Sequence, residues 1–545
     1  MIVSVMLLLQ QAAGPLAVAE DVTRPEADVL HYEIALTLGD SAQDIRAKAM
    51  VRYVITGGDG PLELDFDSVL VVDSITGPAG RIPAAATGRI GPSADGGWQR
   101  RRAARGWVLS VPLWGDPGDT LAVTVHYQGR PRDGLYLRTN YYGEPTVFAD
   151  NWPDRAHFWF PCDDHPSDKA TVAFSVEVPP TWRAVANGRL EGVDTLPHQR
   201  TRWRWRSARP IPTYTMVVGA GRLAVTALPT LTAVPQSLWT FPEDSAFAVQ
   251  GPFRRATLMV DAYTQLIGAF PYSKLAHVES ATRFGGMENS SAIFYAESPY
   301  VGRTMSEDLV AHETAHQWFG DAVTARDWHH LWLSEGFASY FGPLFYELVQ
   351  EPDRFREAME RNRRVYMASD VVERPIIDTA EKTVSRLLNE NNYPKAAWVL
   401  HMLRREVGDS AFFAGIRAYY STFRDSTALS ADLAGVMERF AGRPLDWFFQ
   451  QWLLQPGYPR LDLTWGYEGG ELSLEIKQTQ APVWGFYRVR LPVAIELETG
   501  GRESFEVEVE ARAATVLRRA LPAKPTRLVP DALGVVLAET SVTAR

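Results

Sequence analysis

Apolar and polar residues alternate along much of the first 225 residues of the chain. In residues 30–38, LHYEIALTL, every second position is apolar, and residues 62–66, 121–127 and 172–178 follow the same pattern. A period of two places successive side chains on opposite faces of a β-strand. Turn-forming runs such as TGGDGP and GDPGD separate these segments. The pattern therefore predicts an antiparallel, sandwich-like β domain over residues 28–225.

One segment of this region departs from the alternation. Residues 91–106 read GPSADGGWQRRRAARG and combine glycine with a run of arginines. Charged, glycine-bearing segments of this kind occur mainly on the surface between elements. We expect a surface loop here, without a function of its own.

From about residue 226 the apolar positions recur three and four residues apart, which is the period of an amphipathic helix. This pattern predicts a mainly helical domain over residues 226–453, with its clearest helices at 253–270, 306–321, 395–408, 411–420 and 431–440.

Helical periodicity ends at residues 452–460, WLLQPGYPR, which contain two prolines and a glycine. The runs LDLTW, LSLEI and FEVEVE then return to alternation and predict a small C-terminal β domain over residues 460–545. At 545 residues the chain is too long for one hydrophobic core. We expect a multidomain α+β protein in the order β, helical, β.

Composition and charge narrow the classes of protein. The chain is 46% hydrophobic and 22% charged, which is typical of an ordered globular protein. Its net charge of −10 and the lack of a dense Lys/Arg block argue against binding to nucleic acid. Cys162 is the only cysteine, which excludes intramolecular disulfides and a thiolate zinc cluster.

The first 19 residues contain an apolar run followed by Ala17-Val18-Ala19, the pattern of a signal peptide and its cleavage site. We therefore expect residues 1–19 to be a signal peptide that exports the protein to the periplasm or the extracellular space; the alternative is a cytoplasmic protein. This apolar run is too short to span a bilayer, and no other stretch reaches about 20 apolar residues. No transmembrane segment is therefore expected. The sequence does not determine the oligomeric state.

Candidate chemistry is concentrated in residues 312–321, HETAHQWFGD. Four residues on a helix turn through 400°, so His312 and His316 project from one face and can reach one metal ion. Catalytic zinc usually has three protein ligands and one open position, so a third ligand is needed. Glu313 points about 100° away and is better placed to contact the attacking water than the metal. Glu335, in WLSEGFASY, lies nineteen residues beyond His316 at the start of the next predicted helix.

These motifs, with FGGMENSSAIFY (284–295) before them, resemble those of the zinc aminopeptidases of the aminopeptidase N and leukotriene hydrolase family, which are gluzincin metallopeptidases. FPCDDHPSDKATV (160–172), NYPKAAWVLHML (392–403) and DWFFQQWLLQPGYP (446–459) extend the resemblance. It implies a thermolysin-like, mainly helical catalytic domain and a C-terminal β-sandwich. Several members of the family continue into a helical cap domain, and without that cap a more open cleft is expected.

The resemblance implies a role for each matching residue. His312, His316 and Glu335 would bind one zinc ion per chain, and Glu313 would act as general base. Tyr393 would donate a hydrogen bond to the oxyanion, although this chain reads Tyr393-Pro394-Lys395-Ala396 where the family usually has Tyr-Glu-Lys-Gly. Proline is tolerated in the first turn of a helix, so the assignment of the tyrosine stands.

The GGMEN segment would bind the substrate, through Gly285, Gly286, Met287, Glu288 and Asn289. Glu288 matches the family residue that binds the free α-amino group, which restricts cleavage to the first peptide bond of a peptide.

The chain departs from the family near residue 152. Where many members place Gln or Glu as a second contact for the amine, this chain has Trp152. Asp150 and Asn151 are near enough to replace that contact, so the preferred N-terminal residue cannot be transferred from relatives. The adjacent pair His329 and His330 points in different directions and is interpreted as structural.

The residues leave other functions open. An endopeptidase of the thermolysin type shares the HExxH helix and the distant glutamate, and a non-catalytic peptide-binding protein could keep the same fold. An epoxide hydrolase side activity is a further alternative, because the leukotriene branch uses the same zinc and tyrosine. The leading prediction is a zinc aminopeptidase acting on peptides with a free N-terminus.

Overall fold

The computed structural model describes residues 16, 24, 26–40, 43–57, 60–85, 97–103, 106–229 and 233–545. Residues 1–19, predicted to be a signal peptide, lie outside this part of the chain except for Leu16. The described residues form two compact units: Trp328–Tyr419 with Leu429–Arg545 make up the first unit, and Ala19–Asp327 with Tyr420–Ala428 the second. The domain boundaries at residues 28–225, 226–453 and 460–545 stay predictions.

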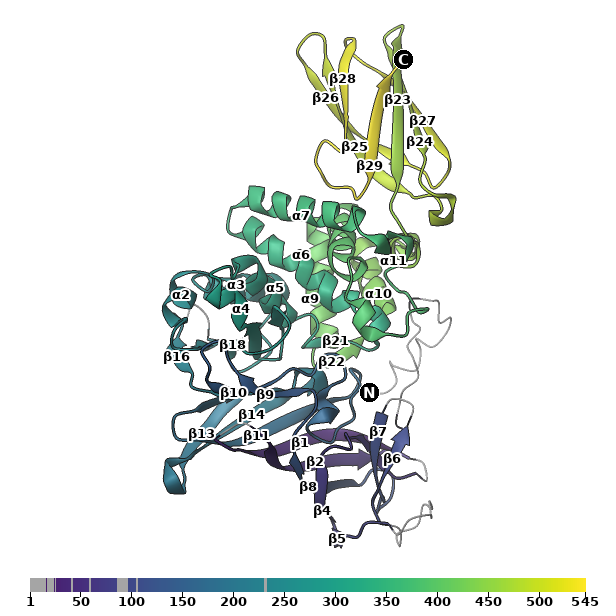
Figure 1. Cartoon of the computed structure of the whole chain (residues 1–545). Helices are drawn as coiled ribbons and strands as arrows, with labels where there is room; N and C mark the ends of the chain where they lie inside the picture. Colours follow the sequence, from purple (N-terminus) through teal and green to yellow (C-terminus); the bar gives the residue numbers. More distant parts are fainter. Residues whose placement is uncertain are drawn as a thin grey trace. The chain divides into compact units, whose positions relative to one another are not determined.

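The second unit begins with an eight-stranded sheet in the order β13-β14-β11-β1-β2-β8-β4-β5 (Figure 1). The predicted strands at 30–38, 121–127 and 172–178 are confirmed as β1, β8 and β11. The pairing is antiparallel except between β1 and β11, which run parallel. The prediction of a purely antiparallel sheet was wrong here, because the chain between β1 and β11 is long enough to return in the same direction. The strands are β1 (Ala27–Leu38), β2 (Ile45–Ile55), β4 (Val71–Gly77), β5 (Gly80–Ile82), β8 (Thr120–Gly129), β11 (Lys169–Val178), β13 (Arg189–Thr195) and β14 (Thr201–Pro212).

Two smaller sheets accompany this large sheet in the second unit. One has the order β12-β15-β10-β9 and the other the order β3-β7-β6. The predicted strand at 62–66 is confirmed as β3. The strands are β3 (Leu62–Asp65), β6 (Gln99–Ala103), β7 (Gly106–Val111), β9 (Leu135–Thr139), β10 (Pro145–Ala149), β12 (Arg183–Ala186) and β15 (Val218–Gly221).

The expectation of a loop at residues 91–106 was wrong for its central part. Gln99–Ala103 forms β6 and pairs with β7, while residues 91–96 and 104–105 lie outside the described residues. Two of the arginines have partners that make them compatible with a strand. Arg101 pairs with Glu63, and Arg100 donates to the carbonyl oxygens of Ser68 and Leu70. Charge alone therefore did not indicate a loop.

The region predicted as mainly helical begins with a five-stranded sheet, in the order β16-β17-β18-β20-β19. Its inner strands β18 and β20 are buried at every position, so they lack the alternation by which a strand is recognised in sequence. The strands are β16 (Ala224–Ala227), β17 (Gln236–Thr240), β18 (Leu275–Ser280), β19 (Gly286–Met287) and β20 (Ala292–Ala296). The second unit also contains the short parallel pair β21 (Val323–Ala325) and β22 (Ser426–Ala428).

Helices α2 and α3 lie between β17 and β18 in the chain, and the other helices follow this sheet. The coarse order of an N-terminal region of several β-sheets and then a helical region is confirmed. Predicted helices at 253–270, 395–408, 411–420 and 431–440 correspond to α3, α8, α9 and α10, whereas the helix predicted at 306–321 ends at His316. Helices α2, α4, α7 and α11 were not predicted. The helices are α2 (Ser245–Gln250), α3 (Ala256–Ile267), α4 (Glu297–Val301), α5 (Glu307–His316), α6 (Trp332–Leu348), α7 (Pro352–Met367), α8 (Ala396–Val407), α9 (Asp409–Phe423), α10 (Ser430–Ala441) and α11 (Asp446–Leu454).

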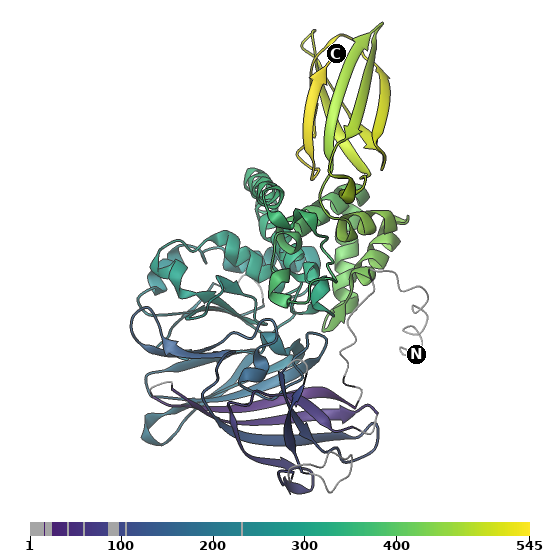
Figure 2. The same ribbon diagram turned by 45° about the vertical axis from the view of Figure 1, so that its right-hand side comes forward.

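The C-terminal strands form two sheets within the first unit, in the orders β27-β24-β23-β29 and β26-β25-β28 (Figure 2). That these two sheets form the expected β-sandwich stays a prediction. The strands are β23 (Arg460–Glu468), β24 (Glu471–Gln478), β25 (Val489–Leu497), β26 (Arg502–Val509), β27 (Ala514–Ala520), β28 (Pro525–Pro530) and β29 (Glu539–Ala544).

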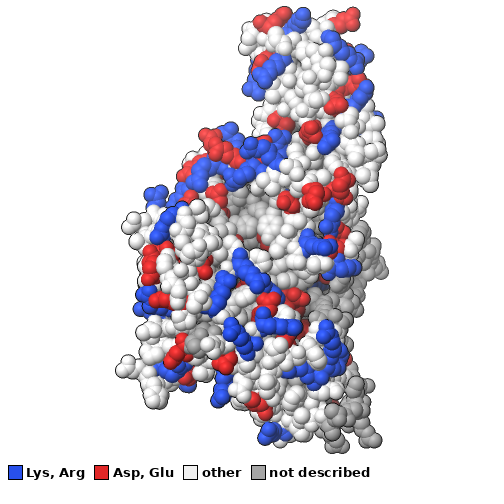
Figure 3. All heavy atoms as spheres, viewed as in Figure 1, with Lys and Arg blue, Asp and Glu red and all other residues white. Residues whose placement is uncertain are grey.

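Charged side chains of both signs are mixed over the face drawn in Figure 3, where Lys and Arg lie among Asp and Glu. None of the helices in the described part of the chain combines the length and apolar character that crossing a membrane requires.

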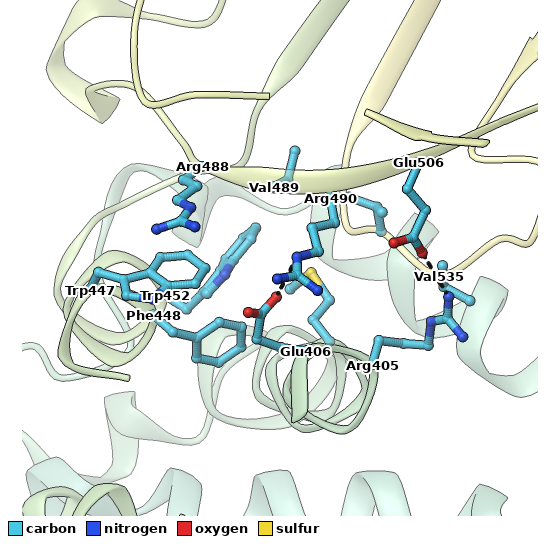
Figure 4. Close-up of a pocket in the computed structure, with 12 residues that line it drawn as sticks. Arg405, Glu406, Trp447, Phe448, Trp452, Arg488, Val489, Arg490, Glu506 and Val535 are labelled. Carbon is cyan, nitrogen blue, oxygen red and sulfur yellow. Dashed lines mark hydrogen bonds and ion pairs between the residues drawn. The ribbon is translucent and has the colours of Figure 1, made fainter. Parts of the chain in front are cut away.

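A pocket of the first unit lies between helices α8 and α11 and the strands β25 and β26 (Figure 4). Trp447, Phe448 and Trp452 supply its aromatic wall. Glu406 pairs with Arg443 at 2.6 Å and with Arg490 at 3.5 Å, and its side chain is 7% exposed. Glu406 thereby joins α8 to β25.

We expect Glu406→Gln to lower the free energy of unfolding by about 1–3 kcal/mol, because it leaves two arginines without their shared carboxylate. Urea unfolding followed by tryptophan fluorescence measures this, since Trp447 and Trp452 line the same pocket. Glu506→Gln is the matched control: Glu506 pairs with Arg405 at 3.2 Å but is 51% exposed, so a loss below about 1 kcal/mol is expected. Equal losses in the two variants would contradict the special role of Glu406.

Candidate metal centre

Helix α5 carries both histidines of the HETAH motif in the second unit. Its first turn is stabilised by the Ser306 hydroxyl, which accepts from the Leu309 N–H at 3.2 Å, and by two acidic residues near the positive end of the helix dipole. The Nε2 atoms of His312 and His316 lie 3.1 Å apart. The four-residue spacing therefore brings two imidazole nitrogens to one point, as predicted from the sequence.

This pair fits a metal ion. The Nδ1 atom of His316 lies 3.1 Å from the carbonyl oxygen of Phe319. A proton on Nδ1 donates to that oxygen and leaves the lone pair of Nε2 for a ligand. Two nitrogens bound to one tetrahedral zinc ion are about 3.3 Å apart, so the pair needs almost no movement to hold one.

Two carboxylates lie beside the histidines. One ligand atom each of Glu288, Glu313 and His316 lie within 4.8 Å of one another, and these side chains are 5%, 4% and 1% exposed. A buried pair of carboxylates at this distance is favourable when a cation lies between or beside them. The cluster could hold a metal ion, and it is equally suited to an ammonium group.

The GGMEN segment passes directly against helix α5. Gly286 begins β19, which is the edge strand of the five-stranded sheet. A Cβ atom at Gly286 would lie 2.3 Å from Oε1 of Glu313, closer than any non-bonded contact allows. Gly286 is therefore required for the close approach of strand and carboxylate. Gly285 has open space at its Cβ position, so the same argument does not apply to it.

Residues 288–291 are held in place by side chains from several elements. Asn187 donates to the carbonyl oxygen of Ser290 at 2.7 Å, and Lys274 donates to that of Ser291 at 2.6 Å and to that of Ala186 at 3.0 Å. Gln317 donates to the carbonyl oxygen of Glu288 at 2.7 Å. Sequence reasoning missed Lys274 and Gln317. For Gln317 the available signal was its position directly after His316 in the HETAHQ run.

The structure places Trp152 next to this segment, 3% exposed, with its ring edge-on to Phe284 at 6.2 Å between centroids. Asp150 is 1% exposed and pairs through Oδ1 with Arg155 at 2.6 Å. Burial raises the pKa of Asp150 to about 6, and the Arg155 guanidinium opposes the rise.

Asn151 has a structural role. Its Nδ2 donates to the carbonyl oxygens of Thr213 and Met216, and its Oδ1 accepts from Trp159. Asp150 and Asn151 were the two candidates for the second contact with the amine. Because the side chain of Asn151 is used in structural hydrogen bonds, only Asp150 is kept as the predicted contact.

The other predicted site residues belong to the first unit. Glu335 lies in the first turn of α6 and is 5% exposed. Tyr393 is half-buried in a π-helical turn (Asn391–Lys395) that leads directly into α8. The role of Tyr393 as hydrogen-bond donor to the oxyanion and the role of Glu335 as zinc ligand stay predictions. His329 lies 2.9 Å from the Glu381 carbonyl oxygen and His330 lies 2.8 Å from the Ser430 hydroxyl, contacts that fit a structural role.

Comparison with known proteins identifies the family. The peptidase family M1 domain matches residues 256–452, and the peptidase M1 N-terminal domain matches residues 90–215. The chain belongs to peptidase family M1. The first match includes the HETAH helix, the GGMEN segment, Glu335 and Tyr393, so the predicted site residues other than Asp150 lie inside the M1 domain. The resemblance inferred from the motifs is confirmed.

Individual M1 relatives are distant. Tricorn protease-interacting factor F2 of Thermoplasma acidophilum is 27% identical over 64% of this chain and 46% of its own length. Glutamyl aminopeptidase of Sus scrofa is 26% identical over 63% of this chain and 38% of its own length. Aminopeptidase N of Lactococcus lactis is 27% identical over 62% of this chain and 43% of its own length. The chain thus spans less than half the length of these M1 relatives.

The buried amine of Lys274 gives a testable pH dependence. Burial lowers the pKa of Lys274 to about 7, whereas an unfolded lysine titrates near 10.4. Between these values the unfolded chain binds one more proton than the folded chain, so stability from this group rises with pH. We expect the free energy of unfolding of the parent protein minus that of Lys274→Met to increase by about 1.4 kcal/mol per pH unit between about pH 7 and 10.

Urea unfolding at a series of pH values measures this difference. The exposed Lys48 on β2 provides the control, since Lys48→Met removes an amine that remains in solvent. If the difference in free energy of unfolding between the parent protein and Lys274→Met does not change with pH, the folded chain keeps this ammonium charged.

Proposed function

We propose that this chain is a zinc-dependent aminopeptidase that removes the N-terminal residue from peptides. The observation that carries the proposal is the position of the Glu288 carboxylate, within 4.8 Å of Glu313 and His316. In a peptide the α-amino nitrogen and the first carbonyl carbon are about 2.5 Å apart. An ammonium bound by Glu288 would therefore present the first peptide bond to Glu313. The names of the relatives from Sus scrofa and Lactococcus lactis support the same activity.

His312, His316 and Glu335 are the proposed zinc ligands. The nitrogens of His312 and His316 lie 3.1 Å apart, and imidazole nitrogens and a carboxylate such as that of Glu335 are ligand types that zinc prefers. When bound, zinc supplies Lewis-acid chemistry that polarises a carbonyl group and makes water nucleophilic at neutral pH.

Glu313 is the proposed general base. It is 4% exposed and faces the edge strand through Gly286, where the substrate backbone would lie. Its carboxylate would take a proton from the attacking water and return it to the leaving amine. A hydroxyl donor would stabilise the oxyanion that forms in this attack, and Tyr393 is the proposed donor.

The outer edge of β19 provides a place for the substrate backbone. Because β19 is the last strand of its sheet, one of its sides is not paired within the sheet. An extended peptide can add to such an edge through main-chain hydrogen bonds, and Gly286 has no side chain to obstruct it. Met287 and Asn289 flank the anchoring glutamate in the same segment.

Asp150 is the proposed second contact for the amine. Arg155 occupies its Oδ1 atom, while Oδ2 has no hydrogen-bond partner among the described residues. This oxygen is thus available to an ammonium, although the nearby arginine weakens the attraction. Compared with a relative that uses Gln or Glu, the pocket beside Trp152 would have a different shape.

The rival interpretation is an endopeptidase of the thermolysin type. Such an enzyme needs no carboxylate for an amine, and the buried Glu288 next to Glu313 therefore favours the aminopeptidase. A non-catalytic peptide-binding protein would bind peptides without turnover. Assays with free and N-blocked peptides distinguish the three.

We expect the purified protein to contain one zinc ion and to lose hydrolysis of aminoacyl-arylamides on chelation. Glu313→Gln should keep the zinc ion and lower kcat by about 10²–10⁴-fold, because the general base is removed and the ligands remain. Elemental analysis and steady-state kinetics measure the two quantities. His312→Ala is the comparison, for which loss of both zinc and activity is expected. A Glu313→Gln protein with zinc and full activity would exclude the proposed mechanism.

We expect acetylation of the α-amine to abolish hydrolysis of the same arylamides, since the acetylated nitrogen carries no charge for Glu288. Glu288→Gln should raise KM for the free-amine substrate by about tenfold or more, the cost of losing a charge-assisted hydrogen bond. Competition between free and acetylated substrates measures the discrimination. Efficient cleavage of N-blocked peptides would instead support the endopeptidase.

A further inference from the structure

We propose that Gln317 is a positioning residue that sets the location of the amine anchor Glu288 relative to the metal helix. This inference rests on the proposed aminopeptidase function and identifies a residue that controls its selectivity for free N-termini. Gln317 follows His316 directly and is fully buried, so solvent contributes nothing to its hydrogen bonding.

The Gln317 amide uses both of its ends. Its Oε1 accepts from the Ser291 N–H at 2.7 Å, and its Nε2 donates to the Glu288 carbonyl oxygen at 2.7 Å and to Asp321 Oδ2 at 2.8 Å. Two acceptors on one side and one donor on the other leave a single orientation for the amide. Both ends of the segment 288–291 are therefore attached to one side chain.

The other side of this link is itself rigid. Asp321 donates its backbone N–H to the His316 carbonyl oxygen at 3.1 Å. Lys169 donates to the carbonyl oxygens of Asp321 and Ala322, both at 2.9 Å, and to that of Ser426 at 3.1 Å. The turn that follows helix α5 is thus fastened to β11 and β22, and Gln317 transmits its position to Glu288.

The effect of this link on the reaction follows from distance. The space between the Glu288 carboxylate and Glu313 has to match one amino acid residue, and an error of about 1 Å in such a placement can cost about 100-fold in rate. Gln317 contacts neither the reacting atoms nor the metal. It acts through Glu288, so its loss should weaken recognition of the amine more than zinc binding.

The first test is Gln317→Met, which keeps the approximate volume and removes all three hydrogen bonds. We expect one zinc ion per chain, a rise in KM for a leucyl-arylamide of about tenfold or more, a smaller fall in kcat, and reduced discrimination between free and acetylated substrates. Thr314→Val is the matched control. Thr314 is also buried on α5 but donates within its own helix, to Val310 at 2.7 Å, so the parent KM and discrimination are expected.

A second variant removes only the bond to Glu288. In Gln317→Glu with Asp321→Asn, the new carboxylate can accept from Ser291 N–H and from the new amide at position 321, while the Glu288 carbonyl oxygen loses its donor. The number of carboxyl groups is unchanged, which limits damage to folding if Gln317→Met is unstable. We expect the same rise in KM. A folded, zinc-containing protein with the parent KM and discrimination, in either variant, would overturn the proposal.

A binding measurement separates this inference from the proposed function. In zinc-loaded Glu313→Gln protein, calorimetry compares leucinamide with N-acetyl-leucinamide, with and without Gln317→Met. The inference predicts that Gln317→Met weakens leucinamide binding about tenfold or more. Equal leucinamide affinities of the proteins with and without Gln317→Met would overturn it. Absence of hydrolysis by the parent protein would instead reject the aminopeptidase function itself.

Discussion

The candidate site of the second unit depends on the approach of strand β19 to helix α5. Gly286 lies so close to the Glu313 carboxylate that a methyl group has no room between them. Gln317, directly after the same helix, holds Glu288 and Ser291, one and four residues beyond β19. Strand and helix are thus joined at two points, and these points bracket the carboxylate of Glu288. The precision of the candidate site comes from this double attachment together with the hydrogen bonds that Asn187 and Lys274 donate to Ser290 and Ser291.

Two buried lysines, Lys274 and Lys395, and the half-buried Lys169 support the architecture around this contact and in the first unit. Lys169, Lys274 and Lys395 each donate to backbone carbonyl oxygens: Lys169 after helix α5, Lys274 at the end of the GGMENSS run, and Lys395 at Gln455 beyond α11. Burial lowers the pKa of each to about 7. Each lysine joins chain segments that are distant in sequence. These amines are therefore structural, although titratable lysines in a member of a peptidase family invite a catalytic interpretation.

Sequence patterns predicted the elements in which one face is buried and the other exposed. Strands β1, β8 and β11 and helices α3 and α10 were recognisable for that reason. Strands β18 and β20 were not, because every position in them is buried and no period remains. The family of the chain was readable from its motifs. The partners of Asp150 and Gln317 were not, because Arg155 and Ser291 are brought to them by the fold.

The shortness of β19 has a consequence for solubility. An edge that accepts a peptide also exposes unpaired backbone groups, and long exposed edges let sheets of different molecules pair and aggregate. With only Gly286 and Met287 in the strand, the edge offers too few hydrogen bonds to hold a second copy of the sheet. A peptide gains additional binding from its charged terminus, which a neighbouring strand does not have. If a peptide binds to this edge as proposed, the brevity of the strand would permit that binding while offering little for the sheet of another molecule to pair with.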